Sequence, residues 1–317
     1  MRTTYNRLIL SVKNAIPTAG KTILWLLKII LPVSLIVTFL QYWGVIAFIA
    51  YYMAPVFSII GLPGESVIVF ISSLFLSLYA PIAVISTLSL EIREITILAI
   101  MCLISHNMLI ETAIQKKTGS SALIMFFLRL STSFVAAYIL NLILPAHLGT
   151  KHIAEQIIEF GSIGALLQNW LLDAGGLSLK IMLIVLGLMI LQNILKEFKI
   201  LDIISKFFAP FMKVFGLSAN CSFLWFIAQT LGLTYGSAVM IEEVEHKEIS
   251  AYDANLLNYH IAINHSLLED TLLFVAIGVP AGWMIAPRFI LAIIVVWCVR
   301  LIFHLKKIKK KPTALPI

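Results

Sequence analysis

Ionisable and amide side chains interrupt two apolar runs of the sequence, at 95–115 and 254–277. The first run contains His106, Asn107 and Glu111. The second contains more polar groups, namely Asn255, Asn258, Tyr259, His260, Asn264, His265, Glu269 and Asp270. Polar groups inside an apolar helix are costly, so they are functional candidates by default. Histidine and carboxylate side chains in such a setting are typical carriers of protons.

His265 and Glu269 are four residues apart, which places them on one helical face, and Asn258 precedes His265 by two turns on that face. Such a pair can relay a proton, form a purely structural hydrogen bond, or chelate a divalent cation. Two ligands per run without a cysteine are not a specific metal pattern, so we assign no metal and no cofactor. The residues we expect to carry protons are His106, Glu111, His265, Glu269 and Asp270.

Two further apolar segments, 64–88 and 217–243, are polar at their centres, where "SSLFLSLYAP" (72–81) and "AQTLGLTYGS" (228–237) carry hydroxyls, glycine and proline that break helices. Non-helical backbone at membrane depth is tolerated where it lines a wet cavity, so these tips should meet at a site. A continuous kinked helix is the alternative. The expected solute-binding residues are Ser72, Ser73, Ser77, Tyr79, Gln229, Thr230, Thr234, Tyr235, Asn258 and Asn264.

The elements that hold these residues belong to a membrane protein. Of the 317 residues, 60% are hydrophobic and 12% charged, against about 45–50% and ~25% in soluble domains. This excludes a soluble enzyme, a disordered chain and a collagen. The three cysteines lie inside apolar runs, which excludes a disulfide-stapled secreted domain. The net charge of +7 comes from basic residues at helix ends and in loops, so we expect no nucleic-acid partner.

No catalytic motif is present: there is no Walker loop, dinucleotide fingerprint, HExxH or nucleophile elbow. We therefore expect that the chain is not an enzyme. Uphill work without an ATP-binding element must come from an ion or proton gradient.

Eight hydrophobic segments without strand-like alternation predict an all-α polytopic bundle. Their approximate ranges are 22–50, 64–88, 95–115, 121–144, 178–195, 217–243, 254–277 and 288–305. The expected divisions are an N-terminal segment (1–21), a first repeat (22–145), an amphipathic interfacial linker (146–177), a second repeat (178–305) and a basic tail (306–317).

Two pairs of matching stretches indicate the repeat. "MAPVFSIIGL" (53–62) matches "FAPFMKVFGL" (208–217), and "SHNMLIET" (105–112) matches "NHSLLEDT" (264–271). The second match pairs His106 with His265 and Glu111 with Asp270. Two matches in the same order are evidence of duplication.

The positive-inside rule favours an inverted arrangement of the repeats. If 64–88 and 217–243 are re-entrant hairpins, each repeat has three spans, and 19 of the 23 basic residues lie on the side of the N-terminus, Arg129 among them. The other four are Arg93, Lys151, Lys180 and Arg288. We expect a multi-pass protein of the bacterial inner membrane with both termini in the cytoplasm.

The runs "GLPG" (61–64), "YAPIAVIST" (79–87) and "LEIREI" (90–95) resemble the Gate, or nucleoside-recognition, domain. This domain occurs in ferrous-iron permeases, concentrative nucleoside transporters and spore-maturation membrane proteins. The resemblance implies inverted repeats with hairpins. The chain departs from the iron permeases by Leu78 in place of their cysteine and by lacking their GTP-binding domain.

The sequence thus predicts a gradient-driven secondary transporter for a small polar solute, nucleoside-like or another metabolite, with its site near the bilayer midplane. A divalent metal permease and a non-transporting membrane component that recruits partners are the alternatives. The expected partners are the solute, membrane lipid and a coupling proton or sodium ion, and the fold is compatible with a homo-oligomer.

Overall fold

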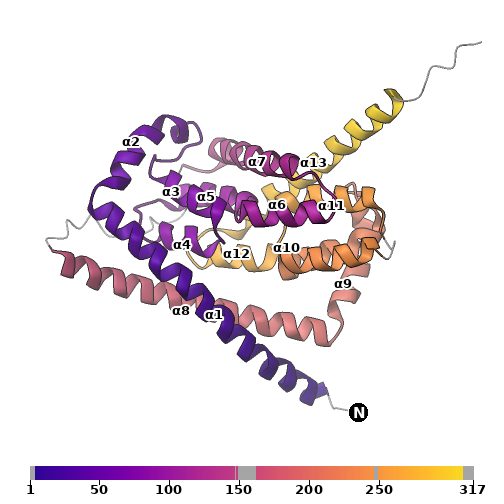
Figure 1. Cartoon of the computed structure of the whole chain (residues 1–317), viewed down its shortest axis with the longest axis horizontal. Coiled ribbons are helices and arrows are strands. Elements are labelled where there is room, and N and C mark those ends of the chain that lie inside the picture. Colours follow the sequence, from indigo (N-terminus) through magenta and orange to yellow (C-terminus); the bar gives the residue numbers. More distant parts are fainter. Residues whose placement is uncertain (1–3, 147, 149–161, 246–248, 310–317) are drawn as a thin grey trace, which may run out of the picture.

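The fold is that of a computed structural model, which describes residues 4–146, 148, 162–245 and 249–309. The regular structure of these residues consists of helices, with no strand among them, which confirms the predicted all-α class. The start of α1 (Thr4–Tyr42) and the end of α13 (Ala281–Lys309) lie at the same end of the molecule (Figure 1).

The helices fall into two series that correspond to the two halves of the chain. The first continues from α1 with α2 (Val45–Ser58), α3 (Ser66–Phe75), α4 (Tyr79–Ile85), α5 (Ile92–Ser105), α6 (Met108–Lys117) and α7 (Ala122–Ile143). The second precedes α13 and consists of α8 (Ile163–Glu197), α9 (Ile200–Phe208), two 3₁₀ turns (Ala209–Lys213 and Ala219–Cys221), α10 (Ser222–Glu245), α11 (Ala251–Ile263) and α12 (Leu267–Val275).

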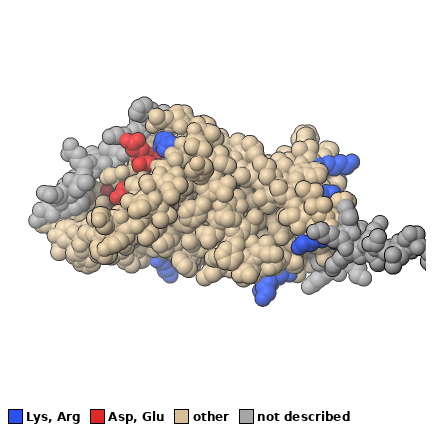
Figure 2. All heavy atoms as spheres, turned by 90° about the horizontal axis from the view of Figure 1, so that it is seen from above, with Lys and Arg blue, Asp and Glu red and all other residues tan. Residues whose placement is uncertain are grey.

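Five helical stretches of the described residues are long and apolar enough to cross a membrane. They are Thr4–Tyr42, Ile92–Lys117, Ala122–Ile143, Ile163–Glu197 and Ala281–Lys306. Large apolar side chains lie exposed on them, such as Leu24 and Leu183, more than 60% exposed. On the face shown in Figure 2, most basic side chains lie toward one end, the acidic ones toward the other, and a broad uncharged band lies between. This surface suits a polytopic membrane protein.

Two of the expected boundaries fall inside helices. α1 begins at Thr4, so the expected division at 21/22 does not interrupt it. α8 begins at Ile163 and runs through 177, so this part of the expected interfacial linker is the first portion of a long helix. Its Trp170 indole donates to Ser34 Oγ of α1 at 3.1 Å, which shows that it packs against a neighbouring helix. Residues 147 and 149–161 of the expected linker lie outside the described residues.

The segment containing α3 and α4 starts and ends at the same end of the molecule. Asn141, near the end of α7, donates to Ile59 O before α3 at 3.4 Å. The same Asn141 accepts through Oδ1 from Arg93, just after the start of α5, at 2.8 Å. Because one side chain binds both flanks, α3 and α4 together form a hairpin whose two ends lie close together.

The segment containing α10 shows the same arrangement beside α13. Before α10, Gly216 O accepts from Arg300 of α13 at 2.8 Å. After α10, the ring of Tyr252 lies 5.9 Å from that of Phe303, one turn further along α13. The two ends of α10 are therefore at one end of the molecule, and the helix is interrupted between them at Gly232, whose φ of 82° and ψ of 171° are not helical.

Candidate functional site

Four interruptions of helices meet near the centre of the molecule. α5 ends at Ser105, His106 caps it, and α6 starts after Asn107, whose φ is 48°. Likewise α11 ends before Asn264, and α12 starts after Ser266, whose φ is 47°. Each break binds the hairpin of its own half, since Asn107 N donates to Ser73 O and Ser266 N donates to Ala228 O, both at 2.9 Å. The broken backbone thus finds partners inside the protein, as membrane depth requires.

A cavity of about 190 Å³ lies among these breaks. Its walls come from both hairpins and from both broken helices, and they are formed by Ser77, Leu78, Tyr79, His106, Asn107, Glu111, Leu231, Gly232, Leu233, Ser266, Glu269, Asp270 and Leu273. The two halves of the chain therefore build one shared polar cavity.

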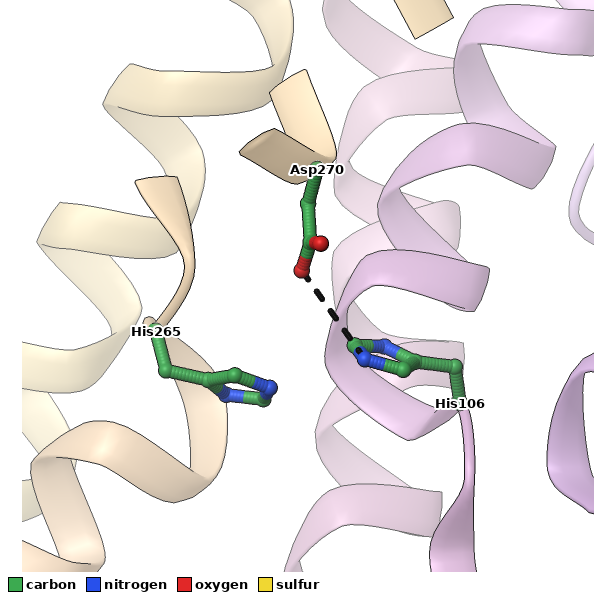
Figure 3. Close-up of side chains that lie close together, drawn as sticks. All are labelled: His106, His265 and Asp270. Carbon is green, nitrogen blue, oxygen red and sulfur yellow. Dashed lines mark ion pairs between the residues drawn. The ribbon is translucent and has the colours of Figure 1, made fainter. Parts of the chain in front are cut away.

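His106 and His265 face each other across this centre, with ring centroids 5.2 Å apart, and Asp270 lies beside them (Figure 3). The Nδ1 atoms are 3.0 Å from Cys102 O and 2.7 Å from Ile261 O, each one turn earlier in the helix. A carbonyl only accepts, so Nδ1 carries the hydrogen in both rings. In the neutral rings the Nε2 lone pairs then point toward the centre.

Glu111 is the carboxylate that connects the two histidines. Its Oε1 lies 3.1 Å from His106 Nε2, and its Oε2 lies 3.4 Å from His265 Nε2. Oε2 also forms an ion pair of 2.6 Å with Arg129 Nη2. Asp270 is farther away, with its Oδ2 at 3.8 Å from His106 Nε2. Four of the five expected proton carriers therefore lie around the point between the two imidazole rings. The fifth, Glu269, lies in the wall of the cavity.

The expected pairing of His265 with Glu269 is wrong. The helical spacing fails because the chain leaves the helix at Asn264 and enters α12 only after Ser266. Glu269 instead accepts from the hydroxyl of Tyr79 in the other half, at 2.9 Å. Asn258, expected on the same face, is buried elsewhere and donates to Thr118 Oγ1 at 2.8 Å.

The expected solute-binding residues are distributed over three settings. Ser77 and Tyr79 line the cavity. Other side chains bind the protein itself: Ser72 donates to Val69 O, Thr230 donates to Phe226 O, and Gln229 donates to Asn264 O. Ser73 and Asn264 are fully buried, and their side-chain polar atoms have no hydrogen-bond partner in the described structure. The side chains of Thr234 and Tyr235 lie outside the described residues.

Sequence reasoning missed two buried arginines. Arg129 was counted among the basic residues that flank spans and Arg288 among those on the opposite side, yet both are fully buried. Arg129 donates to Ile104 O and His106 O at the first break. Arg288 donates to His265 O and Thr271 Oγ1 at the second. Their separation of 159 residues is that of His106 and His265, and this signal in the sequence could have identified them.

The fold and this centre define a polytopic α-helical membrane protein whose two halves line one shared polar cavity. The chain belongs to the Gate family, described as nucleoside recognition, whose sequence model matches residues 23–145 and 178–296. The uncharacterized membrane protein YvoD of Bacillus subtilis (strain 168) is similar, with 32% identity over 307 residues that cover 93% of this chain and 95% of YvoD. No solved structure matches the chain.

Proposed function

We propose that the protein is a secondary transporter that carries a small polar solute across the bacterial inner membrane. The observation that supports this most strongly is the cavity at the helix breaks, which takes walls from both halves of the chain. Transporters commonly bind their solutes where discontinuous helices of two repeats meet. The family to which the chain belongs is consistent with this role.

The volume of the cavity favours a small solute. At about 190 Å³ it is below the roughly 300–1,000 Å³ of sites for drug-sized ligands. Ser77, Tyr79, Glu269 and Asp270 are polar residues of its wall. These groups suit a solute rich in hydrogen-bond donors, such as a nucleoside-like metabolite or a small amine.

The coupling ion in this proposal is a proton. The Nε2 atoms of His106 and His265 and the oxygens of Glu111 are all acceptors when the rings are neutral and the carboxylate is ionised. Their contacts at 3.1 and 3.4 Å become attractive when a proton lies between them. The histidines and carboxylates at this point are therefore the proposed proton carriers, in a protein whose termini both lie in the cytoplasm.

Uptake into proteoliposomes tests the proposal. A panel of radiolabelled nucleosides, amines and organic anions is screened with and without an imposed proton gradient. We expect one class to accumulate only with the gradient. The double variant His106→Gln/His265→Gln should lose gradient-driven uptake, whereas the exposed control His304→Gln should keep it. Unchanged uptake in the double variant would contradict the role of the histidines, and no uptake of any solute would contradict transport.

A further inference from the structure

Three ligand atoms of His106, His265 and Asp270 converge on one point between the halves. Nε2 of each ring and a carboxylate oxygen of Asp270 all lie within 4.8 Å of one another. Figure 3 shows the side chains approaching this point from the two helix breaks and α12. His265 Nε2 and Asp270 Oδ2 are buried and have no hydrogen-bond partner among the described residues. Buried acceptors without a donor indicate that the site is built for a cation.

Both imidazoles are fixed in the form that binds metals. Metal-binding histidines almost always donate their other ring N–H to a carbonyl or a carboxylate, which fixes the tautomer and the orientation. Here Nδ1 of His106 faces Cys102 O at 3.0 Å and Nδ1 of His265 faces Ile261 O at 2.7 Å. His260 is an informative contrast, because it is equally buried but its Nδ1 accepts from the indole of Trp225.

We infer that this point is a binding site for a divalent transition-metal ion, held by His106 Nε2, His265 Nε2 and the carboxylate of Asp270. Two imidazoles and one carboxylate suit zinc, iron and similar ions, whereas calcium and magnesium prefer oxygen ligands throughout. Glu111 lies 3.1 Å from His106 Nε2 and offers a further oxygen, although Arg129 also holds it.

Size and charge are compatible with such an ion. Bonds of about 2.1 Å in tetrahedral geometry place ligand atoms roughly 3.4 Å apart. The His106 to Asp270 separation of 3.8 Å is close to this value, and the widest separation, at most 4.8 Å, needs to close by up to about 1.4 Å. The charged side chains around the point are the carboxylates of Glu111, Glu269 and Asp270 and the guanidinium groups of Arg129 and Arg288. With neutral imidazoles, one negative charge is left over.

The bound ion would take the place of the shared proton, since both use the same lone pairs. The inference rests on the proposed function only in taking this site to be reachable from water; it does not require that the metal is transported. Binding to the purified protein and flux across a membrane can therefore be measured separately.

The test is calorimetric titration of the full chain in detergent, treated with chelator, with Zn²⁺ and, for comparison, Mg²⁺. We expect one Zn²⁺ per chain and no Mg²⁺. His265→Gln and Asp270→Asn should each weaken Zn²⁺ binding more than about 100-fold, because loss of outer partners alone costs about 10–100-fold. The matched control is His260→Gln, which removes a buried imidazole without a neighbouring carboxylate and should leave the affinity unchanged.

Absence of Zn²⁺ binding to the wild type would overturn the inference, as would undiminished binding in a monodisperse His106→Gln/His265→Gln variant. If the variants fail to fold, X-ray absorption at the zinc edge of the wild-type protein tests the site instead. Two imidazole ligands on the zinc support the site, and fewer than two overturn it. Zn²⁺ binding without uptake of any solute would contradict the proposed transport and support the metal site. Gradient-driven uptake without Zn²⁺ binding would overturn the metal site and support the proposed transport.

Discussion

The two halves of the protein build the same framework around the centre but use their carboxylates differently. In each half an arginine binds the carbonyl of the histidine at the helix break. In the first half, Arg129 also forms an ion pair of 2.6 Å with Glu111. In the second half, Arg288 binds the hydroxyl of Thr271, and within the described residues it makes no ion pair with Asp270, the counterpart of Glu111.

Side-chain length accounts for this difference. Asp270 is one methylene shorter than Glu111, and its Oδ2 lies 3.8 Å from His106 of the opposite half. The first half therefore holds its carboxylate in an ion pair with arginine, whereas the carboxylate of the second half has no such ion pair among the described residues. The two halves thus place a carboxylate beside the same centre, and these carboxylates differ by one methylene.

The largest effect is expected from removing Arg129. Arg129→Gln leaves Glu111 buried without its ion-pair partner, which should cost about 3–5 kcal/mol of stability. Arg288→Gln removes hydrogen bonds to neutral groups and should cost about 1–3 kcal/mol. Denaturant unfolding in detergent, followed by tryptophan fluorescence, compares the two variants. Equal losses would break the proposed difference between the halves.

Coupling energies measure the same difference without relying on single variants. A double-mutant cycle of Arg129→Gln and Glu111→Gln should give an interaction energy of about 1–3 kcal/mol. The matched cycle of Arg288→Gln and Asp270→Asn should give a smaller interaction energy, because these two side chains form no ion pair within the described residues and interact only over a longer distance. Similar energies in the two cycles would show that the halves are equivalent.

Restoring the missing methylene should make the second half resemble the first. In an Asp270→Glu background we expect the coupling to Arg288 to rise to about 0.5–2 kcal/mol. The carboxylate is then withdrawn from the cavity, so solute uptake should fall. The conservative control is Glu111→Asp, which should lower the coupling to Arg129. A coupling that does not rise with Glu at 270 would mean that chain length is not the cause.

The smallest effect concerns the hairpin tips, where Ser77 and Gly232 occupy matching places. Gly232→Ala should cost about 1–2 kcal/mol, because the φ of 82° is unfavourable for a residue with a Cβ. Ser77→Ala should change stability by less than about 0.5 kcal/mol yet raise the KM of uptake roughly 2–12-fold, the equivalent of one hydrogen bond. An unaltered KM would remove Ser77 from the solute site.

Much of this architecture could be predicted from the sequence. Apolar runs of membrane length, polar tips in the hairpins and the matched motifs around His106 and His265 led to an all-α bundle with one polar centre. These signals are reliable because hydrocarbon penalises polar groups everywhere except at packed or wet sites.

The pairing of side chains could not be predicted in the same way. The spacing of His265 and Glu269 implies a continuous helix, but the positive φ of Ser266 interrupts it and turns Glu269 toward Tyr79. The sequence predicts that Arg129 and Arg288 are charges at the ends of spans. It does not show that a helix break leaves backbone carbonyl groups without partners, and that these carbonyls need buried donors such as the two arginines. Contacts between halves depend on tertiary packing, which local periodicity does not encode.

If the protein transports a solute as proposed, the cavity at the helix breaks must be reached from both sides of the membrane. Cysteine accessibility tests it most directly: Ser77→Cys is introduced after replacement of Cys102, Cys221 and Cys298, and a membrane-impermeant maleimide is applied from either side. The control is Thr96→Cys, fully buried within α5. The account predicts labelling of Ser77→Cys from both sides, slowed by the solute, and none of the control. Protection of Ser77→Cys from both sides would contradict it.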